Sequence, residues 1–207
     1  DALYLDPKEG RWHPEMPARE RTASAGRFDI GPEYIIKRGM DIWSGDWTAE
    51  VIGERRARLI SVEDPLSGVQ LVREFTLDAE GSHLACTQIT RNHSKETKRW
   101  CHWSRTFAQH GGIAVIPLTP ELSKMPNQYV MVDGQGHIDP RPNDPNIRVR
   151  DGFLEIVAPP AFPKLGIDSY AGWFAYVMPN DLAFVKKYKT YPERDYNELG
   201  GYTISIW

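Results

Sequence analysis

The stretch QLVREFTLDAEGSHLACTQITRNHSKETKRWCHWSRTF, residues 70–107, decides the fold class. It divides into three runs rich in β-branched and aromatic residues, and the turn-forming segments DAEG and NHSK separate them. None of the runs carries apolar residues at the 3.6-residue spacing of an amphipathic helix. The stretch therefore predicts three successive β-strands.

The same pattern continues on both sides of this stretch. Residues 47–61 alternate as two antiparallel strands joined at Gly53, and strand-like runs recur after residue 111 without a convincing amphipathic helix. The chain also contains 17 Gly and 16 Pro, which suit frequent turns. We expect an all-β antiparallel β-sandwich in one domain over 1–207, with an extended arm or loop at 1–26. A long loop region at 119–150 is expected to hold one embedded strand, QYVMVDG.

Composition and charge exclude several classes of protein. The 25 basic and 28 acidic residues give a net charge of −3, which argues against a nucleic-acid-binding protein because phosphate neutralisation needs a basic surface. No apolar run reaches the roughly 20 residues that span a membrane. The sequence starts at Asp1 and stops inside the strand-like run GGYTISIW. We therefore expect missing domain segments, or a partner chain, at two open ends, and we favour an exported (periplasmic or extracellular) protein.

The sequence predicts no metal site and no cofactor. Phosphate-loop, dinucleotide-binding and zinc-protease motifs are all absent. Among the six His, His102 and His110 alone flank one strand end as a two-His alternative, and a single or surface His is the favoured interpretation. If NHSK is a four-residue hairpin turn, the register places Cys86 opposite Cys101 and permits a cross-strand disulfide. The favoured alternative is a pair of buried free thiols.

The segment RWCHWSRTF presents two chemically different faces. On a strand, Trp100 and His102 point to one side, whereas Trp103 and Arg105 point to the other. Both faces suit a pyranose, whose apolar C–H surface stacks on an indole and whose hydroxyls pair with polar side chains. Alternatively, one face is simply core and the other solvent. Trp47, in DIWSGDW, is either a sugar platform or a core residue.

A family resemblance rests on three quoted motifs. The order GRFDIGPE, then PLSGVQLVREFTLDAEGSHLACTQITRNHSKETKRWCHWSRTF, then GGIAVIPL resembles the galactose mutarotase-like superfamily, which contains the aldose 1-epimerases, and most closely a divergent uncharacterised branch. The likeness covers residues 47–118. It implies a β-supersandwich that binds a sugar on a concave sheet face.

The resemblance also implies roles for individual residues. His102 matches the family's sugar-site histidine, and Arg27 resembles the arginine of its early GR segment. A second histidine of the family has no counterpart. The catalytic carboxylate is assigned to Glu198, with Glu193 and Glu155 as alternatives, or lies beyond residue 207. Trp47, Trp103 and Arg105 complete the expected substrate-binding set.

Three functions follow as expectations. The first is a carbohydrate-binding protein without catalysis. The second is an epimerase-like isomerase in which His102 is the acid and Glu198 the base, since mutarotation needs both groups within hydrogen-bond reach of the sugar. The third is a structural or interaction β-sandwich, which predicts an exposed edge strand that needs a partner.

Overall fold

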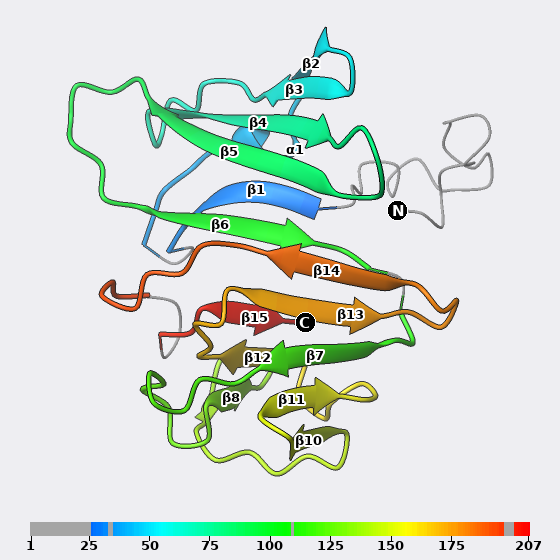
Figure 1. Cartoon of the computed structure of the whole chain (residues 1–207). Coiled ribbons are helices and arrows are strands. Elements are labelled where there is room, and N and C mark those ends of the chain that lie inside the picture. Colours follow the sequence, from blue (N-terminus) through cyan, green and yellow to red (C-terminus); the bar gives the residue numbers. More distant parts are fainter. Residues whose placement is uncertain (1–25, 33–34, 109, 197–200) are drawn as a thin grey trace, which may run out of the picture. The chain divides into compact units, whose positions relative to one another are not determined.

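The computed structural model describes residues 26–32, 35–108, 110–196 and 201–207 (Figure 1). The described part is an all-β structure of antiparallel sheets, and its single helix is the four-residue α1 (Asp41–Ser44). The chain divides into two compact units, an N-terminal unit over residues 1–107 and a C-terminal unit over residues 108–207. The expected single domain stays a prediction. The expected arm at 1–26 lies almost entirely outside the described residues.

The N-terminal unit contains a four-stranded sheet of consecutive antiparallel strands. Its strands are β2 (Thr48–Gly53), β3 (Arg56–Ile60), β4 (Val69–Leu77) and β5 (Leu84–Asn92). The pairing of β2 with β3 confirms the two strands predicted around Gly53. Along β4 and β5 the alternation of side chains separates two faces, and Leu71 lies opposite Thr90 on one of them.

A two-stranded ribbon accompanies this sheet. It pairs β1 (Gly26–Gly31) with β6 (Cys101–Thr106), so β6 is not the hairpin partner of β5. The predicted hairpin register is therefore wrong. Cys86 and Cys101 form no disulfide and are exposed, which contradicts both the disulfide and the expected burial. Local turn residues cannot reveal that a strand 70 residues earlier in the chain competes for β6.

The ribbon is held to the sheet by an apolar core. The core joins residues from β1, α1 and β4, with Trp47 and Trp100 packed against it; its buried members are Phe28, Ile30, Ile36, Ile42, Val69 and Leu71. Trp47 is therefore a packing residue in this structure. The core fixes β1 against β4, and the pairing of β1 with β6 then positions the side chains of β6.

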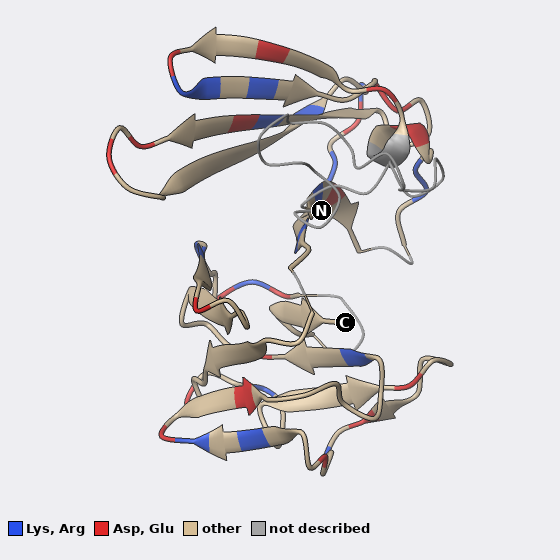
Figure 2. Cartoon of the chain, turned by 90° about the vertical axis from the view of Figure 1, so that its right-hand side faces the viewer, with Lys and Arg blue, Asp and Glu red and all other residues tan. Residues whose placement is uncertain are grey.

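The opposite face of the four-stranded sheet is charged. Arg58 on β3 contacts Glu50 on β2 at 2.9 Å and Glu74 on β4 at 2.7 Å. Figure 2 shows opposite charges on these neighbouring strands. Cross-strand pairs of opposite sign support the strand order on this face.

A tight turn between β3 and β4 is organised by the buried carboxylate of Asp64. It accepts hydrogen bonds from the backbone N–H groups of Gly39 (2.9 Å) and Ser67 (3.0 Å) and from the Ser67 hydroxyl. Burial raises the pKa of Asp64, but the hydrogen bonds from Ser67 and Gly39 outweigh it, and the pKa is lowered overall. Gly68 completes the turn at φ +71°, where a side chain would be strained.

We expect Asp64→Asn to destabilise the N-terminal unit by about 1–3 kcal/mol at pH 7, because an NH2 group replaces one of the two oxygens that accept hydrogen bonds from Gly39 and Ser67. Because the pKa of Asp64 is lower in the folded state than in the unfolded state, the ionised carboxylate stabilises the fold fully at pH values above the unfolded-state pKa of about 3.9. That contribution is lost as the pH falls through the folded value. Denaturant unfolding at pH 7 and pH 3 should show the Asn penalty shrinking in acid, whereas Asp78→Asn, at a half-exposed side chain, should have little effect. An equal penalty at both pH values would contradict this account.

The C-terminal unit is a sandwich of two sheets. One sheet has the order β10 (Ile147–Arg150), β11 (Phe153–Ile156), β7 (Ile113–Pro117), β13 (Trp173–Val177) and β14 (Ala183–Lys187). The other has the order β15 (Ile204–Ile206), β12 (Lys164–Ile167), β8 (Tyr129–Val132) and β9 (Ile138–Asp139). The predicted embedded strand is β8, but the expected loop region at 119–150 also holds β9 and β10.

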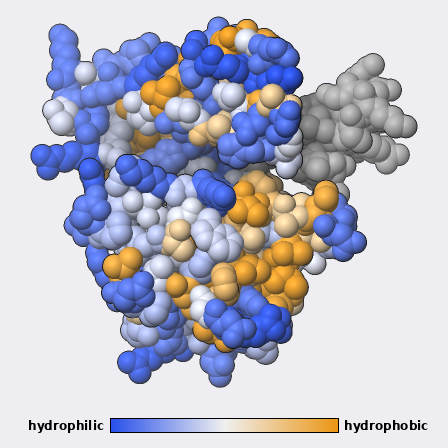
Figure 3. All heavy atoms as spheres, in the orientation of Figure 1, coloured by the Kyte–Doolittle hydropathy of each residue, from blue (hydrophilic) through white to orange (hydrophobic). Residues whose placement is uncertain are grey.

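The inner faces of both sheets share one core. It contains Ile116 and Leu154 from the first sheet and Leu165 and Ile167 from the second, each at most 1% exposed. The outer face of the five-stranded sheet remains partly apolar, since Ile113, Val177 and Val185 are 37%, 43% and 48% exposed. Figure 3 shows hydrophobic side chains gathered over these strands.

Candidate functional site

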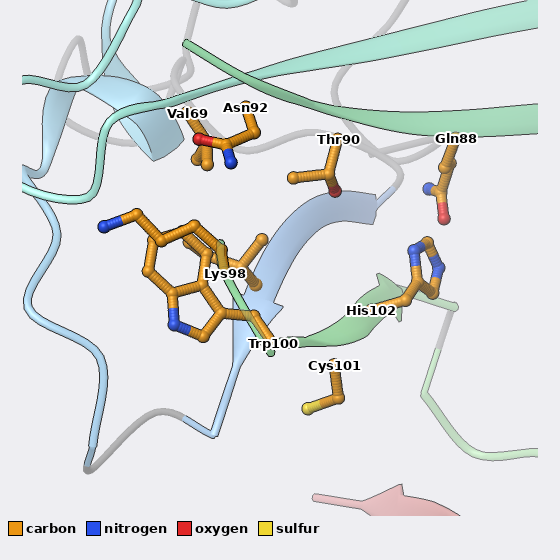
Figure 4. Close-up of a pocket in the computed structure, with 9 residues that line it drawn as sticks. Val69, Gln88, Thr90, Asn92, Lys98, Trp100, Cys101 and His102 are labelled. Atoms are coloured by element: carbon orange, nitrogen blue, oxygen red, sulfur yellow. The ribbon is translucent and has the colours of Figure 1, made fainter. Parts of the chain in front are cut away.

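A pocket of about 310 Å³ lies within the N-terminal unit, between β5 and the start of β6 (Figure 4). Its volume is at the lower end of the range for small-molecule sites, about 300–1,000 Å³. The nine lining residues come from β1, β4, β5, β6 and the segment before β6, and they are Ile30, Val69, Gln88, Thr90, Asn92, Lys98, Trp100, Cys101 and His102.

The polar wall of the pocket comes from strand alternation in β5. Gln88, Thr90 and Asn92 are two residues apart, so their side chains share one face of the sheet. They lie opposite Arg73, Leu71 and Val69 of β4, respectively. Neither the Gln88 amide nor the Thr90 hydroxyl makes a hydrogen bond within the described residues. Both groups are therefore available to a ligand.

Asn92 supports the loop that leads to the opposite wall. Its Oδ1 accepts hydrogen bonds from the Ser94 N–H at 3.0 Å and the Ser94 hydroxyl at 2.7 Å. Its Nδ2 donates to the Glu96 carbonyl at 2.8 Å. Because both ends of the amide are engaged, Asn92 shapes the loop between β5 and Lys98 and is not an open ligand contact.

The aromatic wall comes from Trp100 and His102. Figure 4 shows both side chains on the pocket side of the chain, whereas the Cys101 side chain points away from them. His102 lies opposite Ile30 of β1, and its ring centroid is 4.9 Å from that of Phe28. Gln88 and His102 point toward one another across the pocket (Figure 4).

Lys98 contributes the formal positive charge of the pocket. Its Nζ lies 5.2 Å from the centroid of the Trp100 ring, within the range of a cation–π contact. The same Nζ is 2.9 Å from Glu96 Oε2, and this partner lowers the pKa of the Glu96 carboxyl. No Asp or Glu is among the nine lining residues.

The other residues predicted for sugar binding lie away from this pocket. Arg27, Trp103 and Arg105 share the opposite face of the β1–β6 ribbon, where Arg27 lies across from Arg105. The Arg105 guanidinium is 4.9 Å from the centroid of the Trp103 ring. The alternation was read correctly, but the sequence does not tell which face turns toward the sheet. The sequence-based prediction did not include four of the lining residues, namely Gln88, Thr90, Lys98 and Trp100. The alternation in CTQITRN does place Gln88 and Thr90 on one face of a strand.

Neither Glu193 nor Glu155, the two candidate carboxylates that the structure describes, lines this pocket. Glu198 lies outside the described residues. Glu193 is 68% exposed, with its Oε1 3.8 Å from the Nε of Arg194. Glu155 on β11 is paired with both Arg148 and Arg150, and the hydrogen bond from Arg148 is the main reason that its pKa is lowered. The Glu155 carboxylate therefore fastens β10 to β11 in the C-terminal unit.

Comparison of the chain with protein-family models, with curated proteins and with solved structures finds no match in any of the three. The mutarotase-like resemblance thus stays a prediction from the sequence. Within the described residues, no group of three or more His, Cys, Asp or Glu is arranged to hold a metal ion. The only helix described there is four residues long, so no described helix could cross a bilayer.

Proposed function

We propose that this protein binds a carbohydrate in the pocket between β5 and β6. The observation that carries the proposal is the combination of an indole with an amide, a hydroxyl and an imidazole around one hollow of about 310 Å³. A pyranose ring has an apolar C–H surface and a rim of hydroxyl groups. Trp100 supplies an apolar wall, and Gln88, Thr90 and His102 supply polar groups that can meet the hydroxyls.

The hydrogen-bonding groups set the expected affinity and specificity. A sugar hydroxyl exchanges water for a protein partner, so each neutral hydrogen bond adds only about 0.5–1.5 kcal/mol. A few such contacts plus one aromatic wall give moderate affinity. Each contact is also directional, so a site of this kind discriminates among hydroxyl configurations better than an apolar cleft does.

The test is calorimetric titration of the whole chain with neutral and acidic methyl glycosides and short oligosaccharides. The double variant Gln88→Leu/Thr90→Val should weaken binding about tenfold, because two hydrogen bonds are lost. Thr87→Val is the matched control, since Thr87 lies on the same strand but faces the charged side, opposite Glu74. Failure of every saccharide to bind, or equal losses in the variant and the control, would overturn the proposal.

An aldose 1-epimerase-like activity is the second candidate, favoured by the imidazole of His102 in the pocket. Mutarotation also needs a base on the other side of the anomeric carbon. The same samples therefore receive an anomer-exchange measurement by NMR. Exchange faster than the buffer rate that disappears in His102→Ala would support an enzyme, and binding with unchanged exchange would support a binding protein.

A further inference from the structure

We infer that the preferred ligand is an acidic saccharide, whose carboxylate binds Lys98 in place of Glu96. This inference rests on the proposed carbohydrate site and names its substrate class. It starts from the charges of the pocket, where Lys98 is the one formal cation and no acidic residue is among the nine lining residues. A pocket for a neutral sugar has no need of a positive charge at its wall.

The counterion of Lys98 comes from outside the pocket. Glu96 holds the ammonium at 2.9 Å, yet the Glu96 side chain is 79% exposed and does not line the pocket. The Lys98 side chain is only 21% exposed and lies along the Trp100 ring. The cation is thus fixed by its surroundings, whereas its partner is an exposed side chain free to turn into solvent.

Replacement of the Glu96 carboxylate by a ligand carboxylate at Lys98 is favourable on simple electrostatic and entropic grounds. An exposed ion pair contributes little, because water and salt screen it and two long side chains lose freedom. A ligand carboxylate bound inside the pocket is held at the same time by its ring contacts, so it meets Lys98 without a separate entropic cost. A neutral sugar leaves the Lys98–Glu96 pair intact and gains nothing from it.

The donor set favours a carboxylate over a phosphate. A phosphate dianion is usually met by several donors, such as an Arg fork, a helix N-terminus or a nest of backbone N–H groups. The pocket lining contains one ammonium and no arginine. One ammonium matches the single negative charge of a carboxylate.

The experiment compares methyl β-glucuronide with methyl β-glucoside, which has a hydroxymethyl group in place of the carboxylate. Wild-type protein should bind the glucuronide about tenfold more tightly, because a charged hydrogen bond is stronger than a neutral one. Lys98→Met should remove this preference, so that the two glycosides bind alike, whereas Lys98→Arg should retain it. Lys95→Met, an exposed lysine on the same loop that does not line the pocket, is the matched control.

Glu96→Gln is the most specific test, because it removes the carboxylate that competes with the ligand for Lys98. It should raise glucuronide affinity about two- to fivefold without changing glucoside affinity, a modest gain in keeping with an exposed pair. Equal binding of the two glycosides by wild type would overturn the inference and leave the carbohydrate site standing. A glucuronide preference that survives Lys98→Met would also overturn the inference. Tighter binding of glucose 6-phosphate than of the glucuronide would overturn it as well. Binding of neither glycoside, nor of any other saccharide, would overturn the site itself.

Discussion

Replacing Asp29 with alanine is expected to lower the stability of the N-terminal unit by about 3–5 kcal/mol, the usual cost of breaking a buried ion pair from one side. The Asp29 side chain is fully buried and receives two hydrogen bonds from Arg38, at 2.8 Å to Oδ1 and 2.6 Å to Oδ2. It also accepts the N–H of Ile30 at 2.8 Å. Without the carboxylate, the largely buried Arg38 guanidinium keeps its charge and loses these acceptors.

The position of Asp29 makes this loss relevant to the pocket. It lies on β1 opposite Trp103 of β6, and β1 is the strand that holds β6 in the unit. Denaturant unfolding with hydrogen-exchange readout should show the largest loss of protection at the amides of β1 and β6. Glu54→Ala is the control, because its pair with Arg55 is exposed and worth little. A loss no greater than that of Glu54→Ala would contradict the argument.

The second large effect is expected for Gly166→Ala in the C-terminal unit, at about 1–3 kcal/mol. Gly166 lies at the centre of β12, and a Cβ at this position would be 2.2 Å from Cδ1 of Tyr202. That ring belongs to a small core on this side of the sheet with Met125, Val130 and Val132. The methyl group therefore has to push a buried aromatic ring out of a packed cluster.

Gly134→Ala is the matched control in the same unit, since a Cβ there meets no atom within 4 Å. Its effect should stay within about 0.5 kcal/mol. Thermal and denaturant unfolding of both variants measure the difference. In a Tyr202→Ala background, the Gly166→Ala penalty should largely disappear, because the obstructing ring is gone. A penalty that persists in that background would show that the clash is not its cause.

Much of the fold follows from residue alternation. The strands at 48–60 and 129–132 and the runs near 153, 173, 183 and 204 were expected from it, and the structure has strands at each place. The pairing of β6 was not predictable, because the turn residues NHSK at 92–95 favour a hairpin with β5. In the structure, β6 instead pairs with β1, 70 residues earlier, and β1 belongs to the apolar core. Burial of residues that are far apart in the sequence decides which strand pairs with β6, and no local sequence pattern predicts this pairing.

The candidate site was predictable only in part. His102 follows from the sequence as a candidate, and in the structure it lines the pocket beside Trp100, on the face that strand alternation predicts. Trp103 and Arg105 were favoured because the sequence gives two faces without saying which one turns toward the sheet. Gln88 and Thr90 were missed because they become site residues only when β5 and β6, in different sheets, bound the same hollow. Glu198, which the resemblance assigns as the base, lies outside the described residues.

The most direct measurement is an amide chemical-shift map of the isotope-labelled chain titrated with the tightest saccharide found by calorimetry. We predict shifts at Gln88, Thr90, Trp100 and His102, with the amides of 110–196 essentially unchanged. The same titration of the Gln88→Leu/Thr90→Val variant should need about tenfold more ligand for the same shifts. Shifts confined to residues outside the pocket, or no shifts with any saccharide, would contradict the assignment of a carbohydrate site between β5 and β6.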